Sequence, residues 1–197
     1  MAFKVENLEA LTRGRQRLEA MRDSGARVIQ RATSTLKRRL VPQAKREISS
    51  QYALPAREIA SRLRCTGSSG SVTLTALGRN MTLIKFKARQ TRAGVVAKIT
   101  KGSSVLIAHA FIRVPAGAPG AGPQVMIRAE ALGGLPEKVQ ALAVVRHNKH
   151  GYPIVLLGGP SVADMLREPG REDRLTEFVR QTFSAEIDRL LEVARGK

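Results

Sequence analysis

The sequence predicts an α+β protein with long amphipathic helices at the N-terminus, a central antiparallel β-sheet and a C-terminal helix. Apolar residues recur at helical spacing early in the chain, alternate with polar residues in its middle, and return to helical spacing at its end. We therefore expect three parts: a basic helical arm over residues 1–66, an antiparallel β domain over 67–160, and C-terminal helices over 161–197 that pack on the sheet or on neighbouring subunits.

The arm should begin with two helices between Val5 and about Leu40. The apolar face of the second helix is Val28, Ile29, Ala32, Leu36 and Leu40. At about 100° per residue, its opposite side carries a group that we call the basic row: Arg27, Arg31, Arg38 and Lys45. Pro42 should kink or end this helix after Leu40, because proline lacks an amide donor and clashes with the preceding turn. Lys45 stays in the row only if the kink is mild.

A third helix is expected over residues 55–64, since Pro55 suits a first helical turn. The Gly- and Ser-rich segment 66–71 should end it and form a hinge between the arm and the sheet. Beyond the hinge, alternating apolar residues predict a hairpin of 72–76 with 82–87, and a second hairpin of 95–100 with 104–114. Further strands are expected over 124–129 and 141–147, with a Gly- and Pro-rich loop over 115–123.

The segment 151–166 should join the last strand to the helices that follow. After an apolar strand, Ser161 can cap a new helix, with Asp164 in the capping-box position. A helix N-terminus can also hold a phosphate. Because Asp164 occupies the first turn, we interpret this segment as a structural corner that orients the C-terminal helices against the sheet. The corner consists of Gly158, Gly159, Pro160 and Ser161.

The last helix has the most regular apolar face of the chain. Its apolar positions are Leu175, Phe178, Val179, Phe183, Ile187, Leu190, Leu191 and Ala194. This face is expected to pack either on the sheet or on another copy of the helix.

Charge is the most unusual property of the composition. The chain has 34 Lys and Arg against 16 Asp and Glu, a formal net charge of +18. A surplus of this size favours a polyanion or an acidic partner surface. The single cysteine, Cys65, excludes an intramolecular disulfide, and with three scattered histidines it cannot build a zinc site, so we expect no metal and no cofactor. No signal peptide or membrane-spanning run is expected.

No set of residues in the sequence predicts catalysis. The glycine-rich segment 117–122 lacks the Gly-Lys-Ser/Thr ending of a phosphate-binding loop. His147 and His150 have no acidic or cysteine partner nearby in sequence, and His109 lies within an apolar strand. We therefore expect that the protein is not an enzyme, with no catalytic residues.

The basic row offers a binding function instead. Several phosphates neutralised by this row would give salt-sensitive binding to DNA without sequence preference. Few aromatic residues lie nearby, so base stacking is not expected. The alternative is that the same arginines form ion pairs with an acidic neighbouring subunit or are simply solvated.

From Ile84 to the C-terminus, the chain resembles the minor tail protein Z family of tailed bacteriophages, the tail completion proteins. The order and spacing of five blocks carry the resemblance: 86–95, Ala110-Phe111-Ile112, Val125-Met126-Ile127-Arg128, Tyr152-Pro153-Ile154 and 157–162. The resemblance implies a structural protein of the virion tail, made in the cytoplasm of the bacterial host, that completes the tail at its head-proximal (neck) end and helps to seat the DNA end. It implies no catalytic residues.

Such a protein should assemble with itself and with other tail and neck proteins. Tail structures are rings of identical subunits, so we expect a homo-oligomer of six copies, with three as the second choice. The implied partners are tube, terminator and head-tail joining proteins, together with double-stranded DNA at the basic row and no membrane. The alternative function is a basic nucleic-acid-binding module that acts without sequence preference.

Overall fold

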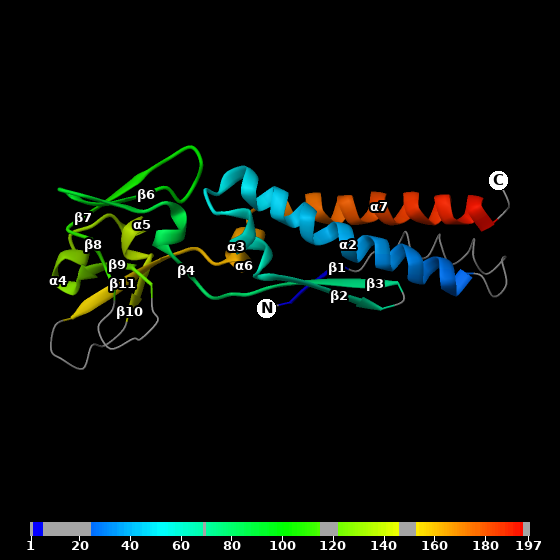
Figure 1. Cartoon of the computed structure of the whole chain (residues 1–197), viewed down its shortest axis with the longest axis horizontal. Coiled ribbons are helices and arrows are strands. Elements are labelled where there is room, and N and C mark those ends of the chain that lie inside the picture. The colour runs from blue at the N-terminus through cyan, green and yellow to red at the C-terminus, as the bar shows by residue number, and fades with distance from the viewer. Residues whose placement is uncertain (1, 6–24, 69, 115–121, 146–152, 195–197) are drawn as a thin grey trace. The chain divides into compact units, whose positions relative to one another are not determined.

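The computed structural model describes residues 2–5, 25–68, 70–114, 122–145 and 153–194 (Figure 1). It is a mixed structure of helices and antiparallel sheets with a C-terminal helix, as the sequence predicts. The chain groups into two compact units. We call them the helical unit, Met1–Glu47, Ile59–Gly78 and Ala163–Lys197, and the sheet unit, Ile48–Glu58 and Arg79–Val162.

The helical unit combines an antiparallel sheet with two long helices. The strands are β1 (Ala2–Val5), β2 (Leu63–Ser68) and β3 (Ser71–Ala76), in the order β1-β3-β2. The long helices are α2 (Gly25–Gln51) and α7 (Arg171–Ala194). The short helices are α3 (Ala56–Ala60) and α6 (Val162–Leu166). The helices α2, α3 and α6 each have one end in the sheet unit.

The start of the arm differs from the prediction. Val5 belongs to β1 and pairs with Val72 of β3, so it does not open a helix. The expected helix after it falls on residues 6–24, which lie outside the described residues.

The end of the arm also differs from the prediction. The expected third helix stops at Ala60, and Thr66, Gly67, Ser68 and Ser71 are paired residues of the β2–β3 hairpin. The predicted hinge is therefore wrong, and the boundary expected at residues 66 and 67 falls inside β2. Glycine suits this hairpin because Gly70 has a φ of 86° and a Cβ at Gly67 would lie 2.6 Å from the carbonyl oxygen of Ser71.

Helix α2 runs through Pro42 to Gln51, so it does not end after Leu40 as predicted. Pro42 is exposed, and the carbonyl of Arg38, which loses its amide partner, can therefore be hydrated. The predicted apolar face is confirmed, with Ile29 half-buried, and it extends further along the helix. Its buried residues are Val28, Ala32, Leu36, Leu40, Ala44 and Ile48.

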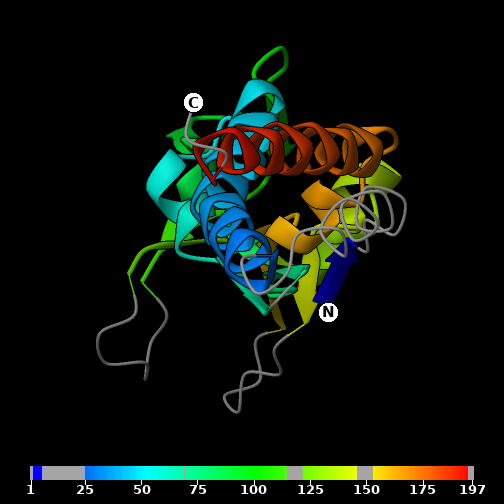
Figure 2. The same ribbon diagram turned by 90° about the vertical axis from the view of Figure 1, so that its right-hand side faces the viewer.

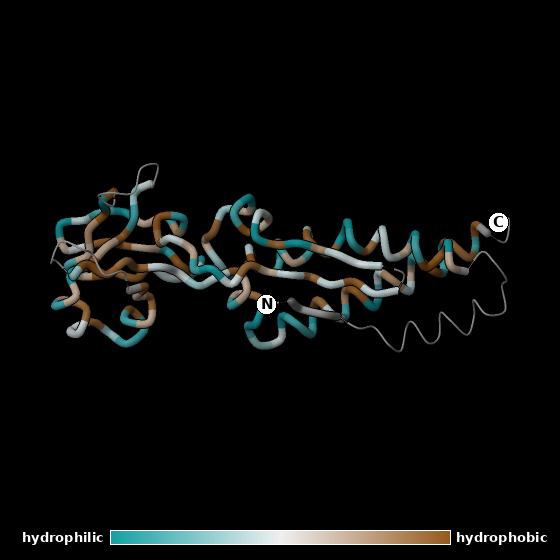
Figure 3. The backbone as a smooth tube through the Cα atoms, turned by 90° about the horizontal axis from the view of Figure 1, so that it is seen from below, coloured by the Kyte–Doolittle hydropathy of each residue, from teal (hydrophilic) through white to brown (hydrophobic). Residues whose placement is uncertain are grey.

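Helix α7 lies antiparallel to α2. The Thr35 hydroxyl donates to Glu186 Oε1 at 3.2 Å, and Arg174 Nε donates to Glu47 Oε2 at 2.9 Å. The earlier residue of α2 thus contacts the later residue of α7, and the later residue of α2 contacts the earlier one, so the two helices run in opposite directions. Figures 1 and 2 place α7 on the side of α2 away from the β1-β3-β2 sheet. In Figure 3, hydrophilic and hydrophobic residues alternate along α7. The predicted apolar face is confirmed at Leu175, Val179, Phe183, Ile187, Leu190 and Leu191, which are all buried.

The sheet unit contains two antiparallel sheets. The larger has the order β10-β11-β9-β8, with β4 also paired to β11, and the smaller has the order β5-β6-β7. The strands are β4 (Met81–Thr82), β5 (Arg89–Thr91), β6 (Gly94–Ala97), β7 (Val105–Ala108), β8 (Phe111–Arg113), β9 (Gln124–Arg128), β10 (Ala143–Val145) and β11 (Ile154–Gly159). The short helices are η1 (Leu83–Phe86), α4 (Ala129–Leu132) and α5 (Glu137–Gln140).

Strand pairing departs from the sequence pattern in two places. The strand over 71–76 does not pair with 82–87, because β3 lies between β1 and β2 and residues 83–86 form η1. The hairpin around residues 101–103 is confirmed as β6 and β7. The long strand expected over 104–114 is broken at His109, whose φ of 60° turns the chain, so β7 and β8 belong to different sheets. The remaining predicted strands are confirmed as β9 and β10 where they are described.

The predicted corner has the right place but a different form. Gly158 and Gly159 are not a turn, since they extend β11 and pair with Thr82 and Met81 of β4. A Cβ at Gly159 would lie 2.4 Å from Cε2 of the buried Phe86, so close packing requires glycine there. The half-buried Pro160 and the fully buried Ser161 then lead into α6. The Ser161 cap and the orienting role of the corner stay predictions.

The contact between Gly159 and Phe86 gives a stability prediction. The substitution Gly159→Ala should lower the free energy of unfolding by about 1–3 kcal/mol, because the added methyl group forces a packed ring to move. Urea unfolding measures this change. Gly133→Ala is the control, since no atom lies within 4 Å of a Cβ built there. Phe86→Leu added to Gly159→Ala should restore part of the loss, and equal effects of the two glycine substitutions would contradict the contact.

Candidate functional site

The basic row lies on the exposed side of α2. Arg27, Arg31 and Arg38 are exposed, and Lys45 is half-buried. Because α2 continues through Pro42, Lys45 stays on the same helix as the other three. Within the described ranges, none of the four forms an ion pair. The row is therefore open to an external anion, and its contact with DNA or with an acidic partner stays a prediction.

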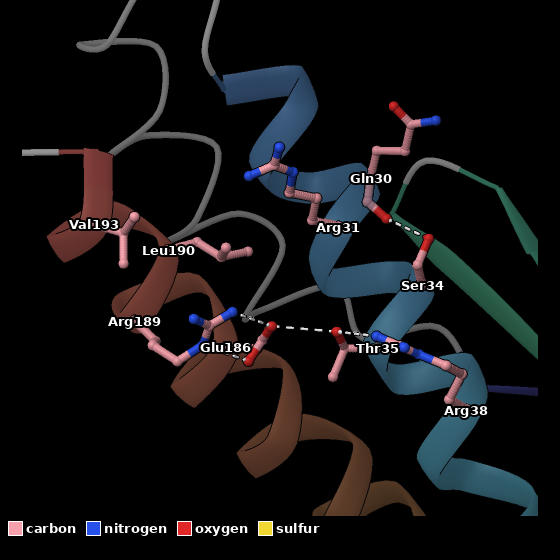
Figure 4. Close-up of a pocket in the computed structure, with 9 residues that line it drawn as sticks. All are labelled: Gln30, Arg31, Ser34, Thr35, Arg38, Glu186, Arg189, Leu190 and Val193. Carbon is pink, nitrogen blue, oxygen red and sulfur yellow. Dashed lines mark hydrogen bonds and ion pairs between the residues drawn. The ribbon is translucent and has the colours of Figure 1, made fainter.

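A hollow of about 450 Å³ lies between α2 and α7 beside this row (Figure 4). The residues that α2 contributes are Gln30, Arg31, Ser34, Thr35 and Arg38, and those from α7 are Glu186, Arg189, Leu190 and Val193. Two members of the basic row, Arg31 and Arg38, thus line a concave surface. Reasoning from sequence missed the half of this site that α7 supplies, because the pairing of α2 with α7 joins residues about 150 positions apart.

A chain of polar contacts crosses the hollow from one helix to the other. Arg189 binds Glu186 through two hydrogen bonds of 3.0 and 2.8 Å. The Thr35 hydroxyl donates to the same carboxylate and accepts a hydrogen bond of 3.4 Å from Arg38. Figure 4 shows these contacts as a continuous chain from Arg189 through Glu186 and Thr35 to Arg38. Glu186 is only 11% exposed, so this carboxylate holds the two helices together from within the contact.

The charges of the hollow favour an anion. Its lining has three guanidinium groups and one carboxylate, and that carboxylate is already bound by Arg189. Arg31 and Arg38 therefore keep their charge available. Val193 is 59% exposed and provides an apolar wall. Guanidinium groups bind carboxylates and phosphates through paired hydrogen bonds, so the site suits an acidic side chain or a phosphate.

The C-terminal helices, in contrast, neutralise much of their own positive charge. Carboxylates pair with arginines three positions later along α6, α7 and the link between them. These pairs are Asp164 with Arg167 at 3.2 Å, Glu168 with Arg171 at 3.0 Å, Glu177 with Arg180 at 3.0 Å and Glu186 with Arg189 at 2.8 Å. The surplus charge of the chain is therefore concentrated elsewhere, on α2 and in the sheet unit.

The other residues considered from the sequence do not form a site. His109 is exposed, while His147 and His150 lie outside the described residues. Cys65 is half-buried in β2, where burial raises the pKa of its thiol against the opposing charge of Lys37. Among the described residues, no group of His, Cys, Asp and Glu could hold a metal ion, and no helix is long and apolar enough to cross a membrane.

A second concentration of positive charge went unnoticed in the sequence. From Ile59 to Ala129 the chain has no Asp or Glu, although it has eleven Lys and Arg. Three of these residues, Lys87, Arg89 and Lys98, line a hollow of about 300 Å³ in the sheet unit. Counting acidic residues along the chain would have found this stretch, because the signal is the absence of acids and not a local cluster of bases.

Acid should weaken the contact between α2 and α7 through Glu186. The pKa of this carboxyl lies below its usual value chiefly because Arg189 donates to it, although burial opposes the shift. Its contribution to stability is therefore complete above about pH 4.5 and is lost as the pH falls through the lowered pKa. The difference in Tm between wild type and Glu186→Gln should be positive at neutral pH and shrink toward zero as the pH falls through the lowered pKa of Glu186.

Thermal unfolding across this pH range checks the expectation. The control is Glu192→Gln, which removes the same charge from an exposed position on α7. A difference for Glu186→Gln that stays constant with pH, or that equals the difference for Glu192→Gln, would contradict the assigned contact.

Comparison with known proteins adds no relative to this description. None of the protein-family models, curated proteins and solved structures with which the chain was compared matches it. The residues described above and the resemblance in the sequence are therefore the basis for a function.

Proposed function

We propose that this chain is a structural protein of a bacteriophage tail. It completes the tail at the head-proximal end, helps to seat the DNA end and acts as a homo-oligomeric ring in the virion. It is made in the host cytoplasm and meets tube, terminator and head-tail joining proteins. In this proposal the protein performs no catalysis and needs no cofactor.

The observation that carries the proposal is that the later blocks of the resemblance meet in one sheet, against which the first block packs. Phe111 of β8 lies opposite Met126 of β9, and Met126 lies opposite Leu156 of β11. Phe86, from the first block, packs against Gly159 at the end of β11. Blocks about 70 residues apart in sequence thus form one packed core. A likeness that coincides with a folded core supports common ancestry more than scattered matches would.

The exposed basic row supports the DNA-seating part of the proposal. A terminal DNA segment in a ring would meet the same row once per subunit, so modest contacts would be multiplied by the copy number. The contacts would be with phosphates and independent of sequence. An acidic face of a neighbouring tail protein is the other partner that suits the row.

A second candidate function is a nucleic-acid-binding module that acts outside the tail. The observation that favours it is the unpaired positive charge of both units, because binding of DNA to these charges needs neither a ring nor a tail partner. It predicts that the isolated protein binds duplex DNA as a monomer.

Assembly tests the first function directly. Sedimentation velocity of the purified chain and image reconstruction of assembled tails should show a closed ring, with six copies expected and three as the second choice. The physical reason is that the exposed cations of α2 have no ion-pair partner among the described residues, so an acidic surface of a neighbouring subunit or a polyanion can bind them. The hypothesis fails if both measurements find only an unassociated monomer.

Charge reversal tests the role of the basic row. The double variant Arg31→Glu and Arg38→Glu should give tails that assemble but deliver no DNA, and the purified variant should bind all duplex sequences more weakly. The matched control, Arg57→Glu with Arg113→Glu, changes two exposed arginines of the sheet unit by the same charge. Unchanged infectivity would contradict a role in DNA seating, and failed assembly would assign the row to a protein partner.

A further inference from the structure

The smaller sheet of the sheet unit has one buried face and one open face. Val95 of β6 lies opposite Ile107 of β7, and both are fully buried. The next register position places Arg89, Val96 and Leu106 side by side on the other face. Leu106 is 51% exposed, so this second face is open in the described unit.

Three cations gather on the open face. Lys87, Arg89 and Lys98 are exposed and line the hollow of about 300 Å³ together with Ser104. The amide of Lys98 donates to the carbonyl of Phe86 at 2.9 Å, which places Lys98 next to Lys87 just beyond the paired residues of β5 and β6. Backbone hydrogen bonds therefore bring the three positive charges close together.

No described carboxylate balances these charges. Glu58 is the acidic residue of the sheet unit that precedes the acid-free stretch, and it pairs with Lys85. No ion pair or hydrogen bond joins the side chains of Lys87, Arg89 or Lys98 to another described residue. Lys87 also has a φ of 55°, a left-handed conformation that residues with a Cβ rarely adopt. Like charges held together without a counter-ion indicate a site that an external anion completes.

The length of the charged face points to a polyanion. Arg92 lies in the turn between β5 and β6, and Lys101 lies in the turn between β6 and β7, and both are exposed. They lie beyond the two ends of β6, which has four residues and is about 13 Å long at about 3.3 Å per residue. Together with Lys87, Arg89 and Lys98 they make five cations, which is more positive charge than a single phosphate group neutralises and suits a polyanion. The open face carries Val96 and Leu106 between its cations but no aromatic ring for base stacking, which favours duplex over single strands.

We propose that the open face of the β5-β6-β7 sheet binds the phosphodiester backbone of duplex DNA. Lys87, Arg89 and Lys98 contact the phosphates, and the hydroxyl of Ser104 is an additional donor. This site is separate in the sequence from the basic row of α2. The proposal of this site depends on the proposed function in one respect only, namely that the polyanion is DNA.

The test compares two triple variants of the full chain for binding to a duplex of 30 base pairs, across a salt series. Lys87→Gln, Arg89→Gln and Lys98→Gln together should weaken binding about tenfold or more at low salt and lower the salt slope by about 2 to 3. The control triple, Arg57→Gln, Arg113→Gln and Lys138→Gln, removes the same charge from exposed positions of the sheet unit. It should change the slope by less than about one. Equal losses in the two triples would overturn the proposal.

A single substitution separates binding from folding. Lys87→Asn removes a charge and places a residue that accepts the left-handed conformation, so the variant should unfold at the same temperature as wild type or higher while binding the duplex more weakly. Unchanged binding by this variant would overturn the role of Lys87. Polyglutamate of equal charge is the competing probe. If it binds as tightly as the duplex and loses the same affinity in the triple variant, the face belongs to an acidic protein and not to DNA.

Failure of this site and failure of the tail function are distinguishable. Duplex binding is measured on purified protein and does not depend on tails, while ring formation and infectivity are measured without reference to this face. A chain that forms rings but binds duplex equally well in both triple variants would keep the tail function and lose the site.

Discussion

Burial of one continuous apolar stripe along α2 is the constraint on which the rest of the structure depends. The stripe holds the helix against the β2–β3 hairpin, where Thr33 accepts a hydrogen bond from the amide of Gly70, and against α7 through Thr35. The end of α2 also supports the sheet unit, because the amide of Lys101 donates to the carbonyl of Gln51 at 2.8 Å. With its apolar side committed in this way, α2 must present its arginines outward.

The distribution of acidic residues explains which cations are available. Half of the 16 acidic residues lie between Asp164 and Glu192, where four of them pair with arginines three positions later. None lies between Ile59 and Ala129. Surface ion pairs add little stability, but they decide where an external anion finds uncompensated charge. In this chain that charge remains on α2 and on the β5-β6-β7 sheet, and both surfaces suit phosphates.

Local periodicity predicted the elements better than their partners. The apolar faces of α2 and α7 and the β6–β7 hairpin follow from spacing alone, since each depends on nearby residues. The pairing of β3 with β1, and of β11 with β4, depends on strands far apart in sequence, which a local pattern cannot rank. The backbone reversal at His109 had no local signal, because the apolar run continues through it. For the same reason, the basic row was found but the contribution of α7 to the hollow was not.

The spacing of the α2 stripe has a geometric consequence for the basic row. Buried residues at strict intervals of four advance by about 40° at each step, so from Val28 to Ile48 the stripe winds through about 200° around the helix axis. The basic row stays within about 40°. The row therefore lies opposite the stripe near Arg38 and approaches it at both ends, since Arg31 lies about 60° from Val28 and Lys45 about 60° from Ile48. Arg38 is exposed and Lys45 is half-buried. The row is thus farthest from the protein interior at its middle, and this limits how many phosphates one helix can reach.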